Sequence, residues 1–130
     1  MRVGIEKLYG IHPCVEDEQP PRSVLLSLFL SDADHNEDFY LAEIAKAAAG
    51  EPNVVIGNHA VWALMSTDKV TLEQMLPGEQ QVDGTQPLRT EISLGEAKQL
   101  ILDWLEAKRQ WHAEHHLTAA ATACALPGSK

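Results

Sequence analysis

The chain has 130 residues, of which 45% are hydrophobic and 22% charged, a composition that excludes wholesale disorder and leaves room for one domain. Its 19 acidic and 10 basic residues give a formal net charge of −9 at pH 7. Such a charge repels the phosphates of nucleic acids and of anionic membranes, whereas it attracts a basic partner. We therefore expect a single folded domain that binds neither nucleic acid nor membrane.

The N-terminal part of the sequence predicts two strands separated by a loop. Alternating apolar residues predict a short strand over residues 3–9. Prolines and an acidic run predict a loop over residues 10–22, because proline lacks a backbone donor and restricts the residue before it. The nearly continuous apolar run of residues 23–30 then predicts a central strand that is covered on both faces.

The middle of the chain predicts one helix followed by strands. Apolar residues at helical spacing predict a helix over residues 37–49, and the segment from Gly50 to Pro52 ends it. Two strand-like segments follow at residues 53–57 and 59–65. A further strand at residues 70–75 forms a hairpin with the second of them.

The last part of the chain predicts a loop over residues 77–87, a short strand over residues 90–92 and a long helix. Ser93 and Glu96 have the spacing of a capping box, in which each side chain bonds to the other's backbone N–H at the start of a helix. Apolar residues then recur at steps of three and four, which predicts a buried stripe formed by Leu94, Ala97, Ile101, Trp104, Leu105 and Trp111.

These elements together predict an α+β fold. We expect a central, mainly antiparallel sheet of about five to six strands with two helices, the longer one C-terminal. The domain covers residues 1–118, and residues 119–130 form a flexible or frayed tail.

One local pattern is typical of a calcium loop. Asp32, Asp34, Asn36 and Asp38 alternate with other residues, and Glu43 follows at the twelfth position. Glu37, however, occupies the position where such a loop needs glycine. We therefore favour the alternative that Asp34 or Asn36 caps the following helix, while Glu37 and Asp38 interact with its positive N-terminal end.

A second pattern lies near the end of the long helix, where His112 and His116 stand one helical turn apart with Glu114 between them. This spacing can chelate zinc, but the glutamate does not follow the first histidine as it does in the H-E-x-x-H motif. Histidines near a helix C-terminus, including His115, also interact well with its negative end. We expect no metal and no cofactor, although the sequence leaves metal binding by these histidines or by residues 32–43 open.

The sequence contains no complete catalytic motif, neither G-x-S-x-G nor a glycine-rich phosphate loop. Cys14 and Cys124 lie far apart and are expected to be free thiols, with Cys14 inert beside His12. The N-terminus lacks the features of a secretory signal, and no apolar stretch is long enough to span a bilayer. These observations predict a binding protein in the cytoplasm rather than an enzyme.

Acidic residues gather in three segments, which we interpret as candidate surfaces for a basic partner. A solvated face without function is the alternative. The residues expected to contact the partner are Asp32, Asp34, Glu37 and Asp38, then Glu16, Asp17 and Glu18, and finally Glu79 and Asp83 in the polar loop.

The second half of the chain resembles small bacterial immunity proteins. The resemblance rests on residues 62–64, 68–73, 91–93 and 101–105, which read Trp-Ala-Leu, Asp-Lys-Val-Thr-Leu-Glu, Glu-Ile-Ser and Ile-Leu-Asp-Trp-Leu. Several such families have this order of a hairpin, an acidic loop and a final helix with a tryptophan. The resemblance implies an antidote of a contact-dependent growth inhibition or polymorphic toxin system, which masks a toxin domain that is often a nuclease with a basic cleft.

Two alternatives remain beside this reading. The chain is either a regulatory or structural binding subunit of another complex, or a small metal-dependent hydrolase whose catalytic groups meet only in space.

Overall fold

The computed structural model describes residues 1–7, 10–17, 20–75 and 87–125, with residues 20–21 and 116–125 described by their backbone alone. In chain order the elements are β1 (Arg2–Lys7), β2 (Ile11–Glu16), α1 (Pro20–Ala33), α2 (Glu37–Ala48), β3 (Val54–Gly57), β4 (Val61–Met65), β5 (Lys69–Gln74), β6 (Arg89–Ser93) and α4 (Leu94–Ala125). The fold is α+β and the longest helix is C-terminal, as predicted.

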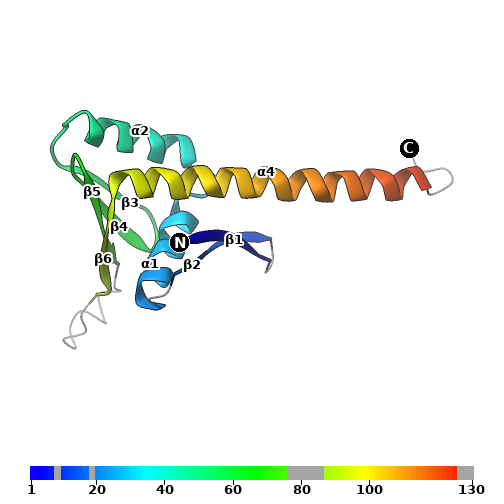
Figure 1. Ribbon diagram of the computed structural model, residues 1–130, viewed down its shortest axis with the longest axis horizontal. Coiled ribbons are helices and arrows are strands. Elements are labelled where there is room, and N and C mark those ends of the chain that lie inside the picture. Colours follow the sequence, from blue (N-terminus) through cyan, green and yellow to red (C-terminus); the bar gives the residue numbers. More distant parts are fainter. Residues whose placement is uncertain (8–9, 18–19, 76–86, 126–130) are drawn as a thin grey trace.

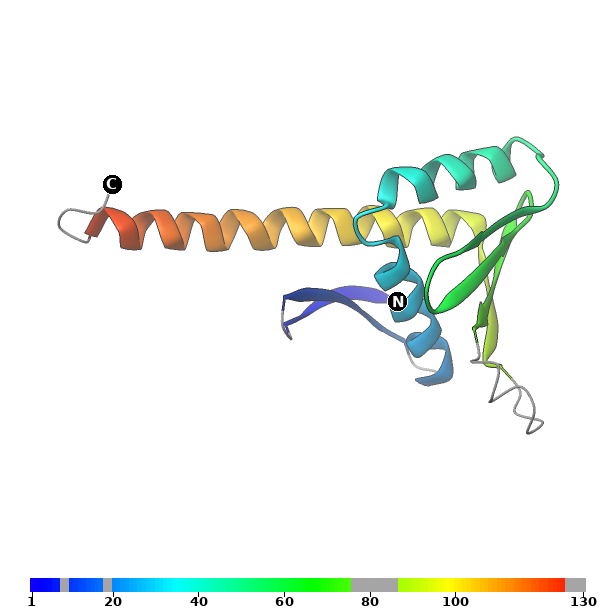
Figure 2. The ribbon, with the colours of Figure 1, turned by 180° about the vertical axis from the view of Figure 1, so that it is seen from behind.

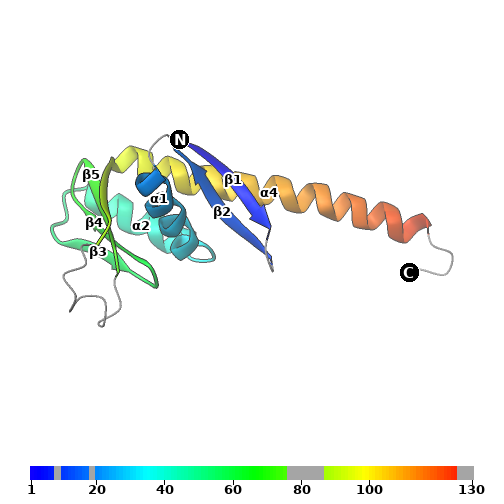
Figure 3. The ribbon, with the colours of Figure 1, turned by 90° about the horizontal axis from the view of Figure 1, so that it is seen from below.

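The strands form two antiparallel sheets rather than the expected single sheet of five to six strands. The first pairs β1 with β2, and the second has the order β3-β4-β5-β6. All three described helices lie on one side of the four-stranded sheet, and the β1-β2 hairpin lies below α4 (Figure 1). The C-terminal half of α4 extends past the other elements in two perpendicular views (Figures 1 and 3).

The segment expected to be a central strand, residues 23–30, is part of helix α1, so the fold has a third helix that we did not predict. A continuous apolar run suits a buried strand and a buried helix equally, because neither needs a polar face. Here Leu25, Leu26, Phe29 and Leu30 are almost wholly buried. The prolines that we took for loop residues stand in the first turn of α1, where proline is tolerated.

Strand β2 lies within the segment that we expected to be a loop. Pro13 pairs with Ile5 across the two-stranded sheet. Proline is tolerated there because each strand of a two-stranded sheet has a free edge that needs no donor. The prediction of a loop over residues 10–22 was therefore wrong for this part.

The predicted helix over residues 37–49 and the strands of the second sheet are confirmed within one or two residues. Gly50 ends α2 with a positive φ of 97°, and the N–H of Glu51 donates to the carbonyl oxygen of Lys46 at 3.1 Å. The predicted loop over residues 77–87 lies almost entirely outside the described residues.

The capping box at the start of α4 is present. The backbone N–H of Glu96 donates to Oγ of Ser93, and the backbone N–H of Ser93 donates to Oε1 of Glu96, both at 2.9 Å. We expect Ser93→Ala to lower the free energy of unfolding by about 1 kcal/mol, because one N–H of the first turn loses its acceptor. Urea denaturation followed by tryptophan fluorescence measures the change, and an unaltered midpoint would contradict it.

The core lies between the four-stranded sheet and the helices. The burial of the sheet residues alternates along β3 and β4, which places one face inside and the other outside. The inner face contributes Val54, Ile56, Val61, Ala63, Met65, Val70, Leu72 and Ile92 to the core, where they pack with Trp104, Ile101 and Phe29 of the helices.

No described helix is long and apolar enough to span a lipid bilayer.

Candidate partner-binding surface

Asp32, the first of the acidic residues expected at the surface, is buried at the C-terminal end of α1 and is only 4% exposed. Its Oδ2 accepts backbone N–H bonds from His59 at 3.3 Å, Ala60 at 2.9 Å and Val61 at 3.1 Å. A carboxylate at the negative end of a helix is unfavourable on its own, so these three donors offset both its burial and the helix dipole. Asp32 thus joins α1 to the turn between β3 and β4.

Asp34 and Glu37 are likewise engaged within the fold, because both bind Lys108 of α4. The Nζ of Lys108 donates to Oδ1 of Asp34 at 2.7 Å and to Oε2 of Glu37, and Nε1 of Trp104 donates to Oδ1 of Asp34 at 3.1 Å. The Lys108 Nζ also lies 5.3 Å from the centre of the Trp104 ring. These contacts connect α4 to the junction between α1 and α2.

The pKa values of Asp34 and Lys108 shift in the directions expected of paired charges. Burial alone would raise the pKa of Asp34, but the hydrogen bonds from Lys108 and Trp104 outweigh it and hold that pKa below 3.8. Burial alone would lower the pKa of Lys108, but the bonds to Asp34 and Glu37 raise it above 10.5. Asp34 and Lys108 are therefore charged at neutral pH.

The structure describes three of the other acidic residues expected at the surface, and they lie on different parts of the chain. Asp38 is exposed on α2. Glu16 is exposed on β2, where it pairs with Arg2 at 2.7 Å, and Asp17 lies 3.4 Å from Arg22. The remaining three, Glu18, Glu79 and Asp83, lie outside the described residues.

The two metal-like patterns do not gather ligands in the described part of the chain. There, no group of three or more histidine, cysteine, aspartate or glutamate side chains is arranged to hold a metal ion. The ring of His115 stacks on that of Trp111 at 3.7 Å between centres, and His112 meets the same ring edge-on. The side chain of His116 lies outside the described residues.

Strand β2 places His12 and Cys14, two residues apart, on one face. Glu6 is paired with His12 across the hairpin. All three residues line a hollow of about 400 Å³ between the hairpin and α1, together with serines of α1. Cys14 is a half-buried free thiol there. This hollow is the feature that an enzymatic alternative would use.

An apolar patch lies on the outer face of the four-stranded sheet. Val55 of β3 and Trp62 and Leu64 of β4 are between 41% and 49% exposed. Val55 is paired with Leu64, so the three side chains are neighbours across two strands. The described helices lie on the opposite side of the sheet, so none of them covers this face (Figure 2). We call these three residues the open-face patch.

Charged residues cover the other half of the same face. Lys69 lies 3.6 Å from Glu91 and Arg89 lies 3.7 Å from Glu73, across strands β5 and β6. Glu73 is in turn the cross-strand partner of Trp62. The open-face patch therefore has a polar border on one side, as the centre of a protein interface typically has.

The ring of Trp62 lies directly against Gly57 of the neighbouring strand β3. A Cβ atom at Gly57 would lie 2.1 Å from Cζ3 of the Trp62 ring, so glycine lets the ring lie across the neighbouring strand. The ring thus covers β3 and remains partly exposed. A large, partly exposed tryptophan with few accessible rotamers is the kind of residue that contributes most to binding at protein interfaces.

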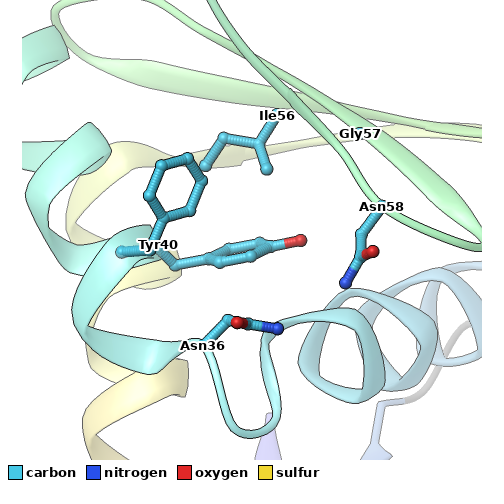
Figure 4. Close-up of a pocket in the computed structure, with 6 residues that line it drawn as sticks. Asn36, Tyr40, Ile56, Gly57 and Asn58 are labelled. Atoms are coloured by element: carbon cyan, nitrogen blue, oxygen red, sulfur yellow. The ribbon is translucent and has the colours of Figure 1, made fainter.

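A pocket lies at the other side of β3, between the end of that strand and the start of α2. It has a volume of about 190 Å³ and is lined by Asn36, Phe39, Tyr40, Ile56, Gly57 and Asn58 (Figure 4). Phe39 is exposed at its rim, whereas Tyr40 is buried. Gly57 belongs to both the pocket and the strand beneath the Trp62 ring, so the pocket adjoins the open-face patch.

Our sequence reasoning missed both of these features. The alternation of residues 54–65 indicates that Val55, Trp62 and Leu64 share one face, but nothing local tells which face the helices cover. Asn36 and Tyr40 lie about one turn apart at the start of α2, and only the tertiary fold brings Asn58 to them. Comparison with known proteins adds no family: no family model, curated protein or solved structure matches the chain.

Proposed function

We propose that this chain is a non-catalytic immunity protein that binds a basic, nuclease-like toxin domain through the open-face patch. The observation that carries the proposal is a tryptophan and two aliphatic side chains, about half exposed, on a sheet face that no described helix covers. An exposed apolar cluster with a polar border is typical of a protein-binding site. The cytoplasm, where the antidote is made, is the proposed location.

The charge of the chain supports a basic partner. Most of its basic residues already form ion pairs with acidic groups of the same chain. These residues are Arg2, Arg22, Lys46, Lys69, Arg89, Lys108 and Arg109. The excess acid, with a formal charge of −9, therefore has no internal compensation. Its field would accelerate the approach of a basic domain and disfavour nucleic acid.

The acidic residues divide into two roles in this proposal. Asp32, Asp34 and Glu37 stabilise the fold through the contacts described above. Asp38, exposed next to Phe39 at the pocket, remains in position to contact the partner. The resemblance to immunity proteins supports the same region, because its segments form β4, β5, β6 and the first turns of α4.

Affinity capture from a lysate of the source cells tests the proposal, with the full chain as bait and mass spectrometry of the retained proteins. A toxin domain that regains nuclease activity when separated from the bait is the expected result. The change Trp62→Ser with Leu64→Ser should abolish its retention, because the patch loses its apolar area. Leu102→Ser, which alters an exposed leucine of α4, is the matched control and should leave retention intact.

The competing proposal is a regulatory or structural subunit of another complex. It would use the same open-face patch, so the identity of the retained protein distinguishes the two. Recovery of a metabolic enzyme, unaffected in activity by nuclease inhibitors, would favour the competitor. A third proposal, a metal-dependent hydrolase, requires bound zinc or calcium in the purified chain, which elemental analysis measures.

A further inference from the structure

The side chain of a buried tyrosine, Tyr40, ends in the pocket between α2 and the end of β3. Tyr40 is only 2% exposed, and its ring meets Phe29 edge-on at 5.7 Å. Its hydroxyl points along the pocket toward Asn58 (Figure 4). Burial, and secondarily the charge of Asp32, raises the pKa of Tyr40 to about 12, so the hydroxyl keeps its proton.

None of the hydrogen bonds in the described part of the chain involves this hydroxyl. The hydroxyl of a buried tyrosine usually has a hydrogen-bond partner in the protein, in water or in a ligand. A tyrosine whose ring is fixed in the core and whose hydroxyl ends in a pocket is therefore suited to bind a group that enters from outside.

Two amide side chains face the same pocket with hydrogen-bonding capacity to spare. Asn36 stands at the N-cap of α2, but its side chain makes no capping bond to the helix. Asparagine at this position usually does cap, so its amide is available for another contact. Asn58 donates its Nδ2 to the carbonyl oxygen of Asp32 at 3.0 Å, which holds its amide in place and leaves the amide oxygen as an acceptor.

The electrostatic surroundings favour a cation. The carboxylate of Asp32 is close enough to act on Tyr40, and Asp38 is exposed on the same helix. Among the described residues, no lysine or arginine lines the pocket. Phe39, 55% exposed at the rim, offers an aromatic face on which a planar cation can stack.

We propose that this pocket receives the guanidinium group of an arginine from the protein partner. The proposal rests on the proposed function, because it names the side chain by which the basic partner is recognised. Guanidinium carries several N–H donors in one plane, which suits the oxygens of Asn36, Asn58 and Tyr40 around a flat aromatic wall. A carboxylate would be repelled by Asp32, and an ammonium is more strongly hydrated and cannot stack.

The test uses N-acetyl-arginine amide as the probe and follows backbone amide signals of the ¹⁵N-labelled full chain. We expect saturable shifts at residues 36–40 and 56–58, with a dissociation constant on the order of millimolar for one side chain. N-acetyl-lysine amide should bind at least about threefold more weakly.

Tyr40→Phe is the sharpest variant, because it removes only the hydroxyl that has no partner in the fold. It should weaken binding of the arginine probe about threefold to tenfold while shifting the melting temperature by less than about 2 °C. The matched control, Leu102→Ser, should leave probe binding unchanged.

Equal binding of the arginine and lysine probes, or unaltered binding to Tyr40→Phe, would overturn the proposal. A preference for the acidic probe N-acetyl-glutamate amide would overturn it as well. The assay contains no partner protein, so its outcome is independent of the capture experiment. If the arginine probe binds and the Trp62→Ser, Leu64→Ser variant still retains the partner, the proposal for the pocket stands. The same result would refute the open-face patch as the site that binds the partner.

Discussion

Replacing Asp32 by alanine is expected to lower the free energy of unfolding by about 3–5 kcal/mol, the largest effect of any change to the acidic residues. The alanine would leave the backbone N–H groups of His59, Ala60 and Val61 without their acceptor in a site that is almost closed to water. Asp32→Asn should lose less, because its amide oxygen can still accept from part of this set. Urea denaturation followed by tryptophan fluorescence measures both changes.

Asp38→Ala is the matched control, since it removes an exposed carboxylate from the same stretch of chain. Its free energy of unfolding should stay within about 0.5 kcal/mol of the wild type. If Asp32→Ala unfolds at the same urea concentration as Asp38→Ala, the three backbone hydrogen bonds to Asp32 do not stabilise the fold as we propose.

The second large effect is expected from Lys108→Met, which keeps the length of the side chain and removes its charge. Asp34 and Glu37 would then remain half-buried or buried without Lys108, and Asp34 would keep the bond from Trp104 and a 3.5 Å contact with His35. Removal of one partner from such a group costs about 2–4 kcal/mol at neutral pH. Lys98→Met, an exposed lysine of the same helix, is the control and should have little effect.

Wild type and Lys108→Met should differ in their free energy of unfolding, and the pH dependence of this difference follows from the pKa shifts of Asp34 and Lys108. The pKa of Asp34 is lowered in the fold, so its contribution is present above the unfolded value of 3.8 and is lost as the pH falls through the folded pKa. The pKa of Lys108 is raised, so its contribution is complete below 10.5 and is lost as the pH rises through the folded pKa. The difference in stability should therefore be largest between these limits. A difference that stays constant from pH 3 to pH 11 would contradict the assignment.

The sequence alone correctly predicted those elements whose formation depends on residues close together in the chain. The period of residues 37–49, the alternation along β3 and β4, and the Ser93 to Glu96 capping box each depend on neighbours a few residues apart. Residues 23–30 were misassigned because an apolar run without a polar face carries no period that separates helix from strand. The number of sheets followed from that error, since a helix now stands where a central strand was expected.

The candidate site depends on contacts between distant segments, which the sequence does not display. Asp32, Asp34 and Glu37 lie close together in the chain and suggest one acidic surface. Their partners, however, are the β3-β4 turn for Asp32 and Lys108 of α4 for the other two. Only packing reveals that these carboxylates stabilise the fold, and that Trp62 rather than an acidic cluster lies on the sheet face that no described helix covers.

Calorimetric titration of the captured toxin domain with wild-type chain and with the Trp62→Ser, Leu64→Ser variant tests the central claim most directly. We predict that the dissociation constant rises at least about 100-fold for this variant, because it removes the apolar centre of the interface, and stays unchanged for Leu102→Ser. Equal affinity of the wild type and the Trp62→Ser, Leu64→Ser variant, with both folded, would show that the partner binds elsewhere on the molecule.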